Sequence, residues 1–298
     1  MKNQSLDADN TGREDSGSIG FWSTFTHGKV WKAGRYPLLS ILAFLYLVPV
    51  IVLIMTSFKT QIQIMSRSPS WIFMPTLGNY RNVLMEQGFL RYLINSLIVG
   101  SVATFFTLII GGFASYALVR FNFLGRGTIS FSTLLLRMIP PAVLVVPIYV
   151  LWSYFGLADT LLGLVVIYVG LNLPFTIWVL ISFIADVPVE LEEAAVVDGC
   201  GPWKIFFTII LPLIKPGLAA AAIFTFRIAW NEFILALVLT NRITRTLPVA
   251  TTIYLTDTGV EWGNITAMGT LVALPAIIFT FLAAKQLIAG LTAGAVKG

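Results

Sequence analysis

The chain alternates between long apolar runs and shorter polar segments. A helix needs about 20 apolar residues to cross a bilayer, and six of the runs approach or exceed this length. The predicted spans cover residues 38–57, 93–118, 129–153, 161–184, 213–239 and 266–288. Apolar residues are continuous within each run rather than alternating, which favours helices over the strands of a closed barrel. The pattern therefore predicts an all-α integral membrane protein with six transmembrane helices.

Several of the predicted spans contain proline. In a membrane helix, proline marks a kink or an unwound turn, which persists where neighbouring protein or a water-filled cavity satisfies the freed carbonyls. The residues concerned are Pro49, Pro140, Pro141, Pro147, Pro174 and Pro275. Irregular packing is the alternative explanation for any one of them.

The composition agrees with a membrane protein and excludes several functions. Charged residues make up 11% of the chain and mean hydropathy is +0.87, whereas soluble domains are usually about 25% charged. One cysteine and one histidine leave no internal disulfide and no thiolate cluster for a metal. The net charge of +5 is spread along the chain, so we expect a lipid bilayer rather than nucleic acid as partner. No G-x-x-x-x-G-K-[ST] phosphate loop occurs, so we predict that this chain is not the ATPase. The single histidine excludes zinc-protease spacing and no nucleophile with a nearby base is discernible, so we predict no catalytic or metal-binding residue.

Six spans place both termini on the same side of the membrane. The segments on the side of the termini hold eleven Lys and Arg residues, and those on the opposite side hold six. Because cytoplasmic loops carry an excess of Lys and Arg, we predict that both termini are cytoplasmic.

The segment between the fourth and fifth predicted spans contains strong helix signals. Pro188 suits the first turn of a helix, and Gly199 suits the position just past its end. Three acidic residues, Glu190, Glu192 and Glu193, fall in the first turn, where the helix dipole favours negative charge. These residues predict a short helix of about ten residues.

A second helix is predicted to begin directly afterwards, at Gly201 and Pro202. Its apolar residues recur at helical spacing: Ile205, Phe206, Ile209, Ile210 and Leu213. The segment is therefore a helix, a sharp turn and a helix between two spans. The pattern alone leaves open whether it is a packing device or a docking site.

The same segment carries a motif. Its residues are Glu193-Ala194-Ala195, then Gly199, Ile209 and Leu211-Pro212. This spacing resembles the EAA loop of ABC importer permeases, complete and in register. The resemblance implies the type I importer permease fold, with residues 186–212 forming a cytoplasmic coupling helix and loop seated on an ATP-hydrolysing subunit. It implies these coupling residues: Glu193, Ala194, Ala195, Asp198, Gly199, Ile209, Leu211 and Pro212.

Further motifs resemble the carbohydrate-uptake subfamily, which is related to the maltose permease subunit MalG. They are Asn95-Ser96, Ala117-Leu118-Val119-Arg120-Phe121, Arg137-Met138-Ile139-Pro140-Pro141, Asn172-Leu173-Pro174-Phe175 and Trp230-Asn231-Glu232-Phe233. The likeness covers residues 36–298, a single permease domain. Residues 1–35 are predicted to be a cytoplasmic tail, partly disordered or lying at the bilayer surface.

The resemblance implies a permease subunit of an ATP-driven, binding-protein-dependent importer of a carbohydrate or polyol, in the bacterial inner membrane. Its implied partners are a second related permease subunit, two ATPase subunits and an extracytoplasmic solute-binding protein. ATP and Mg would be used by the ATPase, and this chain would bind no cofactor. A secondary transporter or channel that works without ATP is the alternative.

Five polar residues within the predicted spans are candidates for a substrate pathway. They are Arg137, Asn172, Arg227, Asn231 and Glu232. A charged residue in a span costs about 2.5–3.5 kcal/mol by insertion scales, so a functional role is the first hypothesis. The alternative is pairing across a helix or subunit interface, which we favour for Arg137 and Glu232 and leave open for Arg227 and Asn231. On one continuous helix, Arg227 and Glu232 would lie about 140° apart, so each would need a partner elsewhere.

Overall fold

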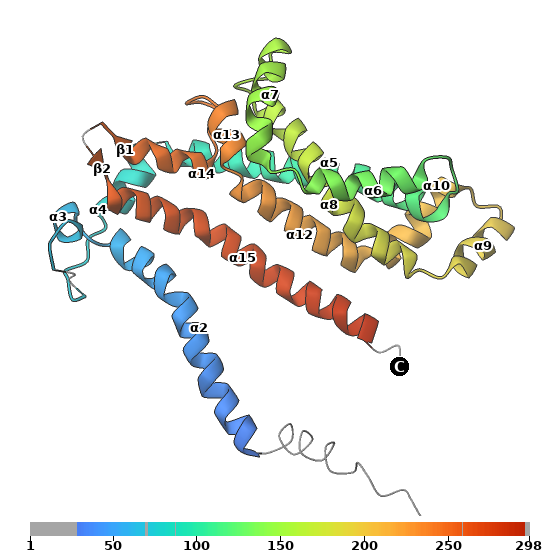
Figure 1. The fold of residues 1–298 in the computed structure, drawn as a ribbon, viewed down its shortest axis with the longest axis horizontal. Coiled ribbons are helices and arrows are strands. Elements are labelled where there is room, and N and C mark those ends of the chain that lie inside the picture. Colours follow the sequence, from blue (N-terminus) through green and yellow to red (C-terminus); the bar gives the residue numbers. More distant parts are fainter. Residues whose placement is uncertain (1–28, 69–70, 87, 258, 296–298) are drawn as a thin grey trace, which may run out of the picture. The chain divides into compact units, whose positions relative to one another are not determined.

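The structure is a computed structural model of the chain and describes residues 29–68, 71–86, 88–257 and 259–295 (Figure 1). Most of the predicted tail, residues 1–35, lies outside the described residues. The chain divides into two compact units, Met1–Leu53 and Ile54–Gly298. The described part of the first unit belongs to one helix, α2 (Lys29–Ser57), which contains Pro37 and Pro49. Its stretch Tyr36–Ser57 is long and apolar enough to cross a membrane.

The second unit is helical apart from one short hairpin. Its longer helices are α5 (Phe89–Arg120), α6 (Arg126–Arg137), α7 (Pro141–Tyr154), α8 (Leu161–Ala185), α9 (Val189–Val197), α12 (Lys215–Asn231), α13 (Ile234–Leu239) and α15 (Trp262–Ala295). Its short helical segments are α3 (Gln61–Ile64), α4 (Gly78–Arg81), η1 (Asn82–Glu86), α10 (Pro202–Ile205), η2 (Phe206–Ile210), α11 (Leu211–Leu213), α14 (Leu247–Ala250) and η3 (Thr251–Tyr254). The hairpin pairs β1 (Leu255–Thr256) with β2 (Gly259–Val260) in antiparallel register, Leu255 opposite Val260.

The predicted spans fall on these helices, but two of them are not continuous. Within the described residues, four helices are long and apolar enough to cross a membrane, or six segments if two bent pairs each count as one span. The predicted span 129–153 is divided into α6 and α7, which are bent by 101°. Pro140 and Pro141 explain this break: Pro140 is extended, with ψ 132°, and the residue before a proline is disfavoured in the α conformation.

The predicted span 213–239 is also interrupted. The helical segment Pro202–Leu213 meets α12 at a bend of 77°, and α12 ends at Asn231 before α13 begins. Glu232 is extended, with ψ 128°, and its carboxylate accepts the backbone N–H groups of Leu235 at 2.8 Å and Ala236 at 3.0 Å. Arg227 and Glu232 therefore do not share one helix. By contrast, Pro147, Pro174 and Pro275 lie inside helices.

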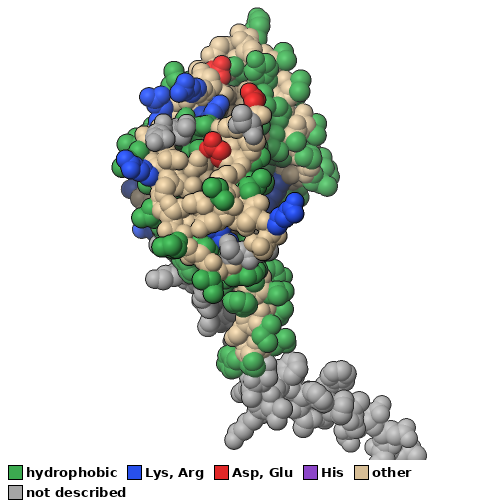
Figure 2. Space-filling model, turned by 90° about the vertical axis from the view of Figure 1, so that its left-hand side faces the viewer, with side chains coloured by type: hydrophobic (Ala, Val, Ile, Leu, Met, Phe, Trp, Pro, Cys, Tyr) green, Lys and Arg blue, Asp and Glu red, His purple; other side chains and the backbone are tan. Residues whose placement is uncertain are grey.

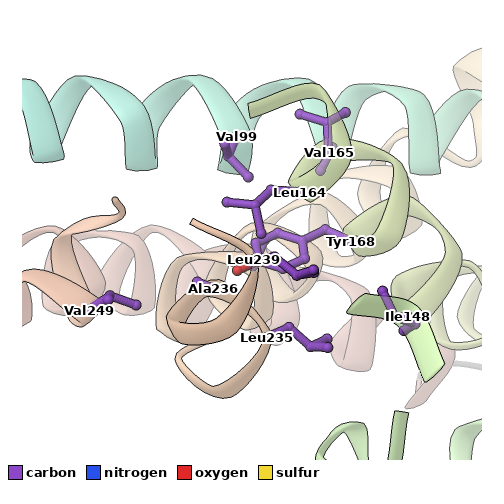
Figure 3. Packing of buried hydrophobic residues seen from close by; sticks show 11 residues of the cluster. Val99, Ile148, Leu164, Val165, Tyr168, Leu235, Ala236, Leu239 and Val249 are labelled. Atoms are coloured by element: carbon purple, nitrogen blue, oxygen red, sulfur yellow. The ribbon is translucent and has the colours of Figure 1, made fainter. Parts of the chain in front are cut away.

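Three clusters of buried apolar residues hold the second unit together. The first joins α5, α7, α8, α12, α13 and α14, and Figure 3 shows Leu164 and Tyr168 of α8 against Leu239 of α13 and near Val99 of α5. The second lies where α5 and α8 meet the segment after α8: Tyr116, Leu180, Ile184, Val187, Ala195, Ile205, Phe206, Ile210, Ile214 and Ala221. The third lies at the other end of α5: Val83, Tyr92, Phe226, Trp230, Leu247, Ala250, Tyr254, Ala267 and Met268.

Glycines allow α8 to approach its neighbours closely. A β-carbon at Gly111 of α5 would lie 2.7 Å from Thr176, and one at Gly217 of α12 would lie 2.4 Å from Phe183. Both contacts are shorter than side chains tolerate, so glycine is required at these crossings. Small residues at helix interfaces are typical of membrane helix bundles.

The end of the second unit that carries α3, α4 and the hairpin has a mixed surface (Figure 2). Lys and Arg side chains lie around this face, with a few Asp and Glu side chains among them. The family motif Asn95-Ser96 anchors the loop after α13: the Asn95 amide donates to the carbonyls of Ile243 at 2.8 Å and Arg245 at 3.0 Å, and the Ser96 hydroxyl accepts the N–H of Leu247 at 2.7 Å.

Candidate functional site: the coupling segment and the polar residues of the spans

The predicted short helix is confirmed as α9, which has nine residues. Pro188 is its N-cap, with Glu190 and Glu192 in its first turn. At its end, the Gly199 N–H donates to the Val196 carbonyl and the Cys200 N–H donates to the Ala195 carbonyl, both at 2.9 Å. These two bonds form a Schellman motif, in which the residue just past the helix is left-handed. Gly199 has φ +79°, as the sequence predicts.

The two sides of α9 differ in exposure. Glu192 and Ala195 are buried, whereas Glu193, Ala194 and Asp198 are exposed. Three of the predicted coupling residues therefore lie on the accessible side of the helix. The buried side belongs to the second apolar cluster, which includes Ala195.

Glu192 is the centre of a polar cluster at the C-terminal end of α5. Its carboxylate accepts the Arg120 Nε–H at 2.5 Å and the Tyr116 hydroxyl at 3.0 Å. The Arg120 guanidinium also donates to the carbonyl of Ile184 in the last turn of α8, at 2.9 Å, and to that of Val187 between α8 and α9, at 2.7 Å. Sequence reasoning did not connect these residues, because Arg120 and Glu192 are 72 positions apart. Glu192 and Ala195 are three residues apart and therefore share one helix face, and this spacing is the sequence feature that could have indicated the buried side of α9.

The second helix of the coupling segment is confirmed from Pro202 to Leu213, with a π-helical turn, η2, in its middle. Ile205, Phe206 and Ile210 are buried, and Ile209 is partly buried. The π turn adds one residue to the helical repeat. As a result Leu213, predicted on the apolar face, is exposed, and Ile214 is buried in its place.

The remaining predicted coupling residues lie next to this turn. Leu211 is partly buried and Pro212 is exposed. On the other side, α10 meets the end of α5 at an apolar pocket of about 390 Å³. Its lining residues are Phe113, Tyr116, Ala117, Phe121, Pro202, Trp203 and Phe206.

Among the candidate pathway residues, the structure brings the two arginines onto neighbouring aromatic rings. The Arg137 guanidinium lies 4.5 Å from the centre of the Phe175 ring, and that of Arg227 lies 5.9 Å from the Phe224 ring. The two rings are in edge contact at 5.8 Å. Both arginines are exposed. Residues from α6, α8 and α12 therefore form one cationic and aromatic surface.

The other three pathway candidates differ in their surroundings. Asn231 is exposed, and its amide donates to the Arg227 carbonyl at 2.9 Å. Asn172 is buried and donates to the Tyr168 carbonyl at 2.7 Å. Glu232 accepts the Tyr168 hydroxyl at 2.7 Å in addition to the two N–H groups of α13. Asn172 and Glu232 thus hold the fold locally, whereas Arg227 and Asn231 present polar groups outward.

The described residues thus form a mostly helical fold with several helices long and apolar enough to cross a membrane, two of the spans bent, as expected of an integral membrane protein. The family model described as "Binding-protein-dependent transport system inner membrane component" matches residues 103–292. The chain belongs to this family, and it is a permease subunit of the ABC importer class.

Relatives and solved structures agree. The chain is 37% identical over 274 residues to the diacetylchitobiose uptake system permease protein DasC of Streptomyces coelicolor, covering 91% of this chain and 98% of that protein. It is 36% identical over 262 residues to the trehalose/maltose transport system permease protein MalG of Thermococcus litoralis, covering 87% and 94%. The fold is similar to that of a chain in a bacterial ABC transporter involved in the import of the acidic polysaccharide alginate, with a TM-score of 0.73, 20% identity and coverage of 86% and 96%.

Proposed function

We propose that this chain is one of two related permease subunits in an ATP-driven importer that takes up a carbohydrate or polyol. The observation that carries the proposal is the likeness, over most of both chains, to permeases named for diacetylchitobiose and for trehalose or maltose. Exposed polar side chains within the spans suit hydroxyl-rich cargo, which exchanges hydrogen bonds with water for hydrogen bonds with protein.

The proposed assembly contains a second related permease subunit, two ATPase subunits and an extracytoplasmic solute-binding protein. ATP and Mg are used by the ATPases, and this chain binds neither. Both termini lie in the cytoplasm, which also places α9 on the cytoplasmic side. The face with α3, α4 and the hairpin then points outward and is available to the binding protein (Figure 2).

The exposed side of α9 supplies the contact with the ATPase. Glu193, Ala194 and Asp198 face away from the spans, so they are free to enter a groove on a partner. Closure of the ATPases displaces α9, and the spans rock from inward-facing to outward-facing. The exposed Arg227 and Asn231, with Arg137 beside the aromatic pair, lie along the cargo pathway.

Purification of the chain from its native membrane, followed by mass spectrometry of bound proteins, tests the assembly. We expect a second permease, an ATPase and, with cargo present, a solute-binding protein. The reconstituted complex should import sugar into proteoliposomes only when ATP is present on the side of the membrane that carries the ATPase subunits. Uptake by this chain alone, without ATP, would support the secondary transporter or channel instead.

A further inference from the structure

Two adjacent glutamates of α9 have different surroundings. The side chain of Glu192 is 10% exposed and lies against the end of α5, whereas Glu193 is exposed. Successive residues of a helix are about 100° apart, so two adjacent side chains cannot point the same way. One glutamate is therefore available to a partner, and the other is bound within this chain.

The bond between Glu192 and α5 is shielded from water. Arg120 is 12% exposed, and its Nε–H donates to one oxygen of Glu192 while the Tyr116 hydroxyl donates to the other. Water and salt screen such a pair weakly. Removal of one partner leaves the other charge buried and uncompensated, so breaking this contact costs more free energy than breaking a surface ion pair.

Arg120 also binds α8. Its Nη2 donates to the carbonyl of Ile184, in the last turn of α8, and to that of Val187, which lies between α8 and α9. The planar guanidinium carries five donors in a fixed fork, so a single side chain holds Glu192 and both carbonyls together. One residue therefore joins α5, the end of α8 and α9.

Tyr116 extends the connection to the second helix of the coupling segment. Its ring centre lies 5.2 Å from that of Phe206 in η2. The helices on both sides of the Gly199 turn are thus attached to the same turn of α5.

We propose that Arg120, Glu192 and Tyr116 are positioning residues that make α9 move together with the ends of α5 and α8, so that displacement of α9 by the ATPase reaches the spans. The proposal rests on the proposed function. The caps of α9 at Pro188 and Gly199 do not involve these side chains. Without the link, α9 keeps its form and its exposed side for the ATPase, but its movement is no longer passed on.

The test uses the complete complex in lipid nanodiscs with its binding protein and cargo. Two quantities are measured for each variant: the amount of ATPase retained per permease, and the stimulation of ATP hydrolysis by loaded binding protein. For Arg120→Ala and Glu192→Gln we expect ATPase content near wild type and stimulation reduced at least about tenfold. Tenfold corresponds to about 1.4 kcal/mol, near the lower end for a hydrogen bond to a charged group.

Conservative variants grade the effect. Arg120→Lys keeps the charge beside Glu192, but a lysine does not reproduce the fork that also binds two carbonyls, so we expect an intermediate stimulation. Tyr116→Phe removes one hydrogen bond and keeps the ring against Phe206, so we expect a smaller loss than for Glu192→Gln. If these residues only stabilise the fold, the variants should differ in the yield of assembled complex, while the stimulation of ATP hydrolysis per assembled complex stays constant.

Two control variants are included. Arg126→Ala tests whether loss of any nearby positive charge has the same effect, and Glu193→Gln tests whether the effect arises from weaker ATPase binding. Arg126 lies in the next helix, and its guanidinium donates to Asn122 at 2.8 Å and to the Val119 carbonyl at 3.3 Å. Arg126→Ala should leave stimulation near wild type. Glu193→Gln should show the opposite pattern to Glu192→Gln: less ATPase retained, with the stimulation of the complexes that remain largely preserved.

Normal stimulation in Arg120→Ala and Glu192→Gln, at equal ATPase content, would overturn the link. Loss of the ATPase in these variants, as in Glu193→Gln, would also overturn it, because the cluster would then serve docking. If Arg120→Ala does not insert, Glu192→Gln and Arg120→Lys decide. A wild-type complex that loaded binding protein does not stimulate would overturn the proposed function together with the link, whereas a stimulated wild type with normally stimulated variants overturns the link alone.

Discussion

Gly199 is the position at which a single substitution should impair the proposed coupling to the ATPase without unfolding the chain. Its φ of +79° is a conformation that L residues with a β-carbon adopt at a cost of about 1–2 kcal/mol. A β-carbon placed there meets nothing within 4 Å, so the cost of Gly199→Val comes from the backbone and not from a clash. This is a small part of the 5–15 kcal/mol that stabilises a typical protein, so we expect the variant to fold and insert.

The strain at residue 199 is relieved if the turn changes conformation. The bonds from Gly199 to Val196 and from Cys200 to Ala195 then break, and the second helix leaves α9 in another direction. A cost of about 1–2 kcal/mol changes an equilibrium by a factor of roughly 5 to 30. We expect Gly199→Val to lower ATPase attachment or binding-protein-stimulated ATP hydrolysis, together with cargo uptake, by a factor in this range, with permease yield near wild type.

Gly201 provides the matched control. It has φ −80° and ψ 166°, an extended conformation that valine adopts readily, and a β-carbon there also meets nothing within 4 Å. Gly201→Val should therefore behave like wild type, and Gly199→Asn should be intermediate, because asparagine tolerates the left-handed region. Normal stimulation and uptake in Gly199→Val, or an equal loss in Gly201→Val, would refute the argument from backbone conformation.

Three further predictions follow from the coupling helix, the spans and the topology. Glu193→Lys reverses a charge on the exposed side of α9, so a pull-down should recover less ATPase although the permease is inserted normally; full recovery would contradict a docking role. Arg227→Ala and Asn231→Ala should lower cargo uptake more than complex yield, because both side chains are exposed and are proposed to line the cargo pathway. A parallel fall in uptake and yield would identify them as structural. Cysteines at Ser18 and Thr256 should be labelled only from the inside and only from the outside, respectively, and the reverse pattern would overturn the topology.

Local signals in the sequence sufficed for α9 because its ends are determined by neighbouring residues. Pro188 and Gly199 fix the start and the end of the helix, and both act within a few positions of themselves. The motif that begins at Glu193 supplied the hypothesis that this helix contacts an ATPase. No such local rule was available for the far side of α9, where Glu192 meets a residue 72 positions earlier.

The interruptions of the spans were harder to predict from hydropathy. Apolar residues occur on both sides of Pro140 and of Glu232, so a window average joins α6 to α7 and α12 to α13. The break at Glu232 depends on its carboxylate, which accepts two N–H groups of α13 and the hydroxyl of Tyr168 from α8. A contact with a distant helix thus selects the broken form over a continuous one.

The prediction of buried positions from helical periodicity was wrong for one turn, because the helix there is not a regular α-helix. The π turn η2 shifts every later position by one residue, which exposes Leu213 and buries Ile214. The polar residues of the spans show the same limit. Arg137 and Arg227 belong to separate predicted spans, and the contact between Phe175 of α8 and Phe224 of α12 brings their surroundings together.

The short length of α9 explains why its inner contacts matter for transport. An isolated helix of nine residues is marginal in water, so α9 depends on its caps and on the packing of Ala195 in the second apolar cluster. Held by these alone, the helix would keep its form but would tilt when the proposed ATPase partner pushes on Glu193, and the loops around it would absorb the displacement. Because Arg120 connects the inner side of α9 to α5 and to the end of α8, we expect the same push to move the spans rather than to be absorbed by the loops. In the proposed mechanism the two adjacent glutamates therefore act on opposite sides of the helix: Glu193 receives the displacement and Glu192 passes it on.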